Sequence, residues 1–93
     1  MQTGNSKNTD LQEIMEPVTT LCDEGKFIHL ILEMPGIAEE KIRIDLEKTT
    51  ITIVASDSSR QYKKVIFLPN EVIFAKKRFS EGKLSLTLEK KGF

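Results

Sequence analysis

From residue 18 onward, apolar and polar residues alternate along most of this chain. A period of two is typical of β-strands, whose successive side chains point to opposite faces. Threonine, isoleucine and valine crowd the alternating segments, which disfavours helix. The pattern predicts strands over residues 18–22, 27–34, 41–47, 50–55, 61–68, 72–75, 76–80 and 84–88.

Turn signals separate these segments at short intervals. Gly25 can take the positive φ of a hairpin, and the Pro35-Gly36 pair ends the most apolar segment. Seven or so short strands with such spacing predict an all-β fold, an antiparallel, immunoglobulin-like β-sandwich. A small five-stranded barrel of the OB type is the alternative architecture.

A chain of 93 residues forms one domain at most. Residues 1–15 are predicted to be a flexible N-terminal segment, because their polar start offers no core. One or two helical turns over residues 9–16 fit Asp10 as a cap with Glu13 three residues on. The sandwich domain is expected to span residues 16–91.

The chain offers little for catalysis. Its one histidine, His29, sits inside the most apolar segment, and its one cysteine, Cys22, precedes acidic residues that would not activate a thiolate. The Glu39-Glu40 pair falls in a turn, where solvated carboxylates are ordinary. The glycines are dispersed and form no phosphate-binding loop. We therefore expect no enzyme activity, no metal site and no cofactor.

Composition points to a cytoplasmic protein. No apolar run reaches the roughly 20 residues of a membrane span, and the polar start lacks a signal core. A single cysteine fits a reducing compartment.

Net charge is zero but divided: residues 1–59 hold 5 Lys/Arg against 11 Asp/Glu, and residues 60–93 hold 9 against 3. Interleaved strands would neutralise this split, whereas segregated ones would leave a polarised surface that steers contacts between copies.

Five short motifs occur in order along the chain. They are Leu32 with Pro35-Gly36-Ile37; Glu40 with Ile42 and Ile44; residues 50–53; Phe67-Leu68-Pro69; and Phe79 with Gly82, Leu84 and Lys90. Together they resemble the α-crystallin domain of the small heat-shock proteins over about residues 16–91. The resemblance implies an ATP-independent chaperone, a holdase that binds unfolding client proteins and forms a homodimer or small homo-oligomer.

The same resemblance implies a groove for polypeptide segments between residues 41–46 and residues 76–80, with Ile42, Ile44, Phe79 and Leu84 as candidate walls. The chain departs from the family in three ways. The loop over residues 56–60 is short, which brings strand-swapped dimers into question. Lys77 and Lys83 stand where the family usually has small apolar residues. No Ile-x-Ile tail follows the last strand.

Two other functions compete with the holdase. A sandwich without terminal extensions also fits a CS/p23-like co-chaperone adaptor that docks a folded partner. Residues 60–64 and 76–79 mix cations with aromatic residues, as single-stranded nucleic-acid surfaces do. Zero net charge and few aromatic residues weigh against that second alternative, so no nucleic-acid partner and no membrane partner is expected.

Overall fold

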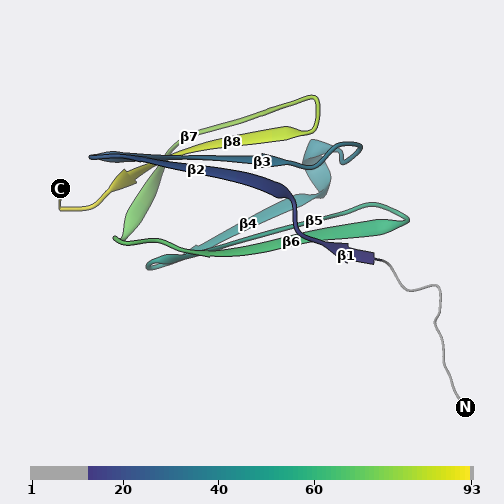
Figure 1. Ribbon diagram of the computed structural model, residues 1–93, viewed down its shortest axis with the longest axis horizontal. Coiled ribbons are helices and arrows are strands. Elements are labelled where there is room, and N and C mark those ends of the chain that lie inside the picture. Colours follow the sequence, from purple (N-terminus) through teal and green to yellow (C-terminus); the bar gives the residue numbers. More distant parts are fainter. Residues whose placement is uncertain (1–12, 93) are drawn as a thin grey trace, which may run out of the picture.

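The computed structural model describes residues 13–92, which form a sandwich of two four-stranded sheets (Figure 1). One sheet has the order β1-β6-β5-β4 and the other β2-β3-β8-β7. All pairings are antiparallel except that of β1 with β6, which is parallel. The strands are β1 (Glu13–Met15), β2 (Val18–Glu24), β3 (Phe27–Glu33), β4 (Ile42–Glu47), β5 (Thr50–Ser56), β6 (Arg60–Phe67), β7 (Val72–Ser80) and β8 (Lys83–Lys90).

The predicted antiparallel β-sandwich is confirmed, with eight strands in place of about seven. A short 3₁₀ helix, Glu39–Lys41, occupies the turn predicted before β4. Both sheets contain strands from the acidic first part and from the basic last part of the chain. Of the two arrangements considered for the divided charge, the interleaved one is therefore present.

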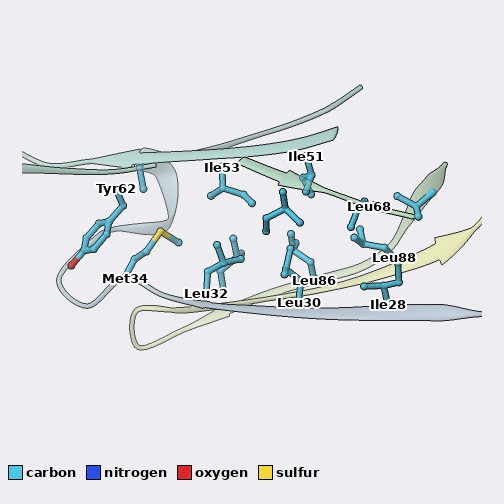
Figure 2. Packing of buried hydrophobic residues seen from close by; sticks show 14 of the residues in the cluster. Ile28, Leu30, Leu32, Met34, Ile51, Ile53, Tyr62, Leu68, Leu86 and Leu88 are labelled. Atoms are coloured by element: carbon cyan, nitrogen blue, oxygen red, sulfur yellow. The ribbon is translucent and has the colours of Figure 1, made fainter. Parts of the chain in front are cut away.

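The core lies between the two sheets (Figure 2). Alternate residues of β3 and β8 point inward from one layer and meet those of β5 from the other, because side chains on one face of a strand recur every two residues. Full burial of each such aliphatic side chain is worth about 1.5–3 kcal/mol. The side chains with less than 2% exposure are Ile28, Leu30, Leu32, Met34, Ile51, Ile53, Leu84, Leu86 and Leu88.

Strand β7 is one element where the sequence predicted two. Its pairing with β8 is regular up to Phe74 and resumes at Lys76, so Ala75 is an extra residue in the ladder. Such a bulge bends a strand and changes which residues point inward. The alternation on either side of Ala75 is therefore out of step, which is why the pattern suggested separate segments at 72–75 and 76–80.

The prediction of helical turns near the N-terminus is wrong for the part that the structure describes. Residues 9–16 were expected to form helical turns, but Glu13–Met15 form strand β1 and pair with the start of β6. The extended conformation is favoured here because it places Met15 beside Tyr62, where Met15 packs against the core. Residues 1–12, which make up most of the predicted flexible segment, lie outside the described residues.

Two of the sequence motifs touch each other. The amide of Met34 donates a 2.6 Å hydrogen bond to the carbonyl of Gly82, so the end of β3 is fastened to the β7–β8 turn. Gly82 has φ +77, and a Cβ at this position would lie 2.8 Å from the Cα of Pro35. Only glycine allows both the left-handed conformation and the close approach.

Candidate functional site

The candidate site lies between two free sheet edges. In the described chain, β4 is the last strand of one sheet and β7 the last strand of the other. Each therefore has backbone N–H and C=O groups along one side that pair with no neighbouring strand, and such an edge can accept an added strand. In Figure 1 the start of β7 rises from the β6 layer to the β8 layer.

A hollow of about 370 Å³ lies between the end of β4 and the start of β7. Four apolar residues and three charged residues, which carry charges of both signs, line it together. This combination suits an apolar side chain whose backbone remains at the surface. The residues that line it are Leu46, Lys48, Glu71, Val72, Ile73, Phe74 and Lys91.

The predicted groove residues fall on the strands named for them. Ile42 and Ile44 are half-buried on β4, and Phe79 is half-buried on β7; all three pack against the core. Leu84 lies on β8 directly opposite Phe79 and is fully buried. Its side chain has no exposed surface, so Leu84 itself cannot contact a ligand. None of the four lines the hollow, which lies at the other end of the two strands.

Sequence reasoning missed the apolar residues of the hollow. Leu46 continues the alternation of Ile42 and Ile44, so the same pattern that named those two could have included it. Phe74 and Ile73 are 43% and 47% exposed, which is unusual for side chains of their size. The signal that could have found them was the apolar start of β7, residues 72–74.

A second exposed apolar region lies on β6. Strand β1 pairs only with Arg60 to Tyr62, so the edge of β6 beyond Tyr62 has no partner strand among residues 13–92. On the outer face of this sheet Val65 and Phe67 are 40% and 78% exposed. Open backbone groups beside exposed apolar side chains are a ready surface for association.

The residues considered for catalysis lie elsewhere, on the outer face of the β2–β3 sheet. His29 Nε2 is 3.1 Å from Glu24 Oε1, and its Nδ1 is 3.3 Å from the hydroxyl of Thr87. The thiol of Cys22 donates to Glu24 Oε2 at 3.5 Å, and this hydrogen bond is the main reason that the pKa of Cys22 is raised. A nucleophilic cysteine needs the opposite, a lowered pKa. No group of three or more potential ligands converges to hold a metal ion within residues 13–92.

The two mixtures of cations and aromatic residues do not form stacking surfaces. Tyr62 is only 6% exposed and lies in the core beside Met34 (Figure 2), whereas Lys63 next to it faces the outer side of the sheet. Phe79 faces the core side of β7, whereas Arg78 before it faces the other side. The aromatic rings within these two mixtures, Tyr62 and Phe79, are therefore turned toward the core. Separately, the described residues contain no helix that is long and apolar enough to cross a membrane.

Comparison with known proteins gives a consistent result. The small heat shock protein hspF of Dictyostelium discoideum is 33% identical over 54 residues, which cover 58% of this chain and 23% of the relative. The chain thus spans about a quarter of that protein's length. No family model matches the chain.

Three solved structures have the same fold. Heat shock protein 16.0 from Schizosaccharomyces pombe superposes with a TM-score of 0.74 at 17% identity, over 92% of this chain and 74% of that one. A small heat-shock protein from Xylella fastidiosa with a distinct high order structure gives 0.70 at 17% identity, over 83% and 87%. HSP18.5 from E. histolytica gives 0.68 at 21% identity, over 81% and 88%.

The two four-stranded sheets and their topology define a β-sandwich of the α-crystallin type. The chain is similar in sequence to a small heat shock protein over 54 residues and shares the fold of solved small heat-shock proteins. The resemblance predicted from the sequence is confirmed.

Proposed function

We propose that this chain is an ATP-independent holdase of the cytoplasm, a non-enzymatic chaperone domain that binds unfolding proteins and self-associates through its sheet edges. The observation that carries the proposal is the pair of free edges, β4 and β7, with a hollow between them that is lined by apolar and charged residues. Unfolding proteins expose extended apolar segments, and such a segment can add to an edge while its side chains enter the groove.

In this proposal the groove runs from Ile42 and Phe79 at one end to Leu46 and Phe74 at the other. The half-buried residues give the apolar wall, and Leu84 lies beside Phe79 on the neighbouring strand. The exposed edge of β6 is the proposed contact between two copies, because Phe67 is the most exposed of the large apolar side chains in the described chain. Burial of apolar surface there would stabilise a homodimer.

A paired experiment tests both surfaces. Protection is measured as light scattering of a heat-labile reporter enzyme warmed with a molar excess of the chain. Binding of a short Ile-x-Ile peptide is measured by fluorescence anisotropy, and solution mass by light scattering with and without the peptide. We expect Phe74→Ala to weaken peptide binding and protection, and Phe67→Ala to lower the mass while peptide binding is kept.

Each variant is the matched control for the other, because both remove the same exposed aromatic ring from different surfaces. A monomeric chain that neither binds the peptide nor slows aggregation would refute the proposal. Capture of one folded partner without any protection would instead favour the CS/p23-like adaptor.

A further inference from the structure

Three consecutive cations occupy the free edge of β7: Lys76, Lys77 and Arg78 are all exposed. None of them forms an ion pair within residues 13–92. Three such cations on one short stretch of edge make the local potential positive, and a positive potential attracts an anion. This edge therefore favours a negatively charged partner.

Other lysines of the described chain are paired with acidic residues that are distant in the sequence. Lys90 lies 2.9 Å from Asp23, Lys64 lies 3.1 Å from Glu16, and Lys26 lies 3.2 Å from Glu89. These three ion pairs neutralise their lysines locally, at positions away from the groove. The basic edge of β7 remains available to a ligand.

The bulge at Ala75 determines which of the three cations faces the groove. Residues directly opposite each other in an antiparallel pair share a face of the sheet. Lys77 lies opposite Leu86, a core residue, whereas Lys76 and Arg78 lie opposite Thr87 and Ser85 on the outer face. Lys77 is therefore on the groove side of β7, between Phe74 and Phe79.

The acidic residues of β4 do not neutralise Lys77. Asp45 lies opposite Thr52 in the β4–β5 pair, and it alternates with the inward-facing Ile44 and Leu46. Asp45 and Glu47 therefore point to the outer face of their sheet, away from the groove. The groove side of the two edges combines apolar residues with a single central cation.

We propose that the groove selects extended segments that carry an acidic side chain between two apolar ones, with Lys77 as the specificity-determining residue. This inference rests on the proposed function, since it concerns the same groove. A strand added to the edge of β7 points every second side chain inward. An acidic residue opposite Lys77 then has apolar neighbours two positions away on each side, facing Phe74 and Phe79.

An inward-pointing lysine on an edge strand can also act only as a guard against edge-to-edge aggregation. The two roles differ in what they predict for ligands. A guard lowers the affinity of every added strand, whereas a specificity residue ranks ligands by the charge at one position.

The experiment uses the whole chain and three labelled peptides. Each peptide has the order isoleucine, threonine, X, threonine, isoleucine, with X as glutamate, glutamine or lysine. Dissociation constants are measured by fluorescence anisotropy at low and high salt for the wild type, Lys77→Glu and Lys76→Glu. Lys76 is an exposed lysine on the outer face of β7, so its variant makes the same charge change on the other side of the same strand.

We expect the wild type to bind the glutamate peptide roughly 1.5- to 5-fold more tightly than the glutamine peptide, as for a partly exposed ion pair. Salt should reduce this ratio. Lys77→Glu should reverse the order so that the lysine peptide binds best, and Lys76→Glu should keep the wild-type order. Circular dichroism would verify that both variants are folded.

The failures can be told apart. If all three peptides bind equally, or if Lys77→Glu keeps the preference for glutamate, this inference is wrong while the groove itself stands. If Lys77→Glu only increases the mass in solution without changing the ranking, Lys77 is a guard and the inference is also wrong. If no peptide binds, the groove assignment in the proposed function fails and this inference fails with it.

Discussion

Replacement of Gly82 by alanine tests whether the contact between the two signature motifs holds the sandwich together. The added methyl group would lie 2.8 Å from Pro35 Cα, and this neighbour is backbone, which cannot move aside without shifting the end of β3. The left-handed conformation alone costs an alanine roughly 1–2 kcal/mol. Loss of the hydrogen bond from Met34 to the Gly82 carbonyl adds about 0.5–1.5 kcal/mol.

We therefore expect Gly82→Ala to lower the free energy of unfolding by about 2–3 kcal/mol, a large part of the roughly 5–15 kcal/mol available to a small domain. Urea denaturation followed by circular dichroism measures the change. Gly92→Ala is the matched control: Gly92 also has a positive φ, +69, but a Cβ there meets nothing within 4 Å. If the two variants unfold at the same urea concentration, the contact at Pro35 does not have the importance assigned to it.

Three further predictions concern the core, the thiol and the turn before β6. Leu86→Ala removes a side chain that is 1% exposed and should cost about 2–5 kcal/mol in urea denaturation; a loss below 1 kcal/mol would mean that the site collapses around the cavity. Because hydrogen bonding to Glu24 raises the pKa of Cys22, Glu24→Gln should speed the reaction of Cys22 with a disulfide reagent at mildly alkaline pH, and an unchanged rate would contradict this cause. The pKa of Asp57 is lowered, first by the Ser59 amide, so its charged form stabilises the fold above the ordinary carboxyl pKa near 3.8, and this contribution is lost as pH falls through the lowered folded-state value. Asp57→Asn should therefore be less stable than the wild type at neutral pH and should differ less from it in acid, and a constant difference across that range would refute the assignment.

The strands were predictable because burial in this fold follows the simplest periodic rule. Inward residues of β3, β5 and β8 alternate without interruption, so the pattern of apolar residues alone locates those three strands to within a residue or two. The hairpins were also predictable where glycine or a charged pair marks a two-residue turn. The start of β1 was not, because Leu11, Ile14 and Met15 have a spacing that also fits a helical face.

The groove was predictable only in outline. Resemblance named the two strands, and the alternation of β4 named Ile42 and Ile44, but neither indicated which end of the groove is hollow. That depends on how the end of β4 and the start of β7 pack against each other, which is a property of the packed sheets. Leu84 was predicted to line the groove because of its place in a sequence motif, although its side chain is fully buried in the core.

The bulge at Ala75 explains why alternation cannot identify the groove cation. Counting in twos from Val72 points Phe74, Lys76 and Arg78 inward, whereas counting back from Phe79 points Lys77 inward. The first count is correct up to Phe74 and the second from Lys76 onward, because the extra residue Ala75 shifts the alternation by one position. Since three cations are adjacent, a shift of one residue would not change the composition of the edge. It would change which cation lies between two aromatic side chains in the groove, and only that position can rank ligands by charge.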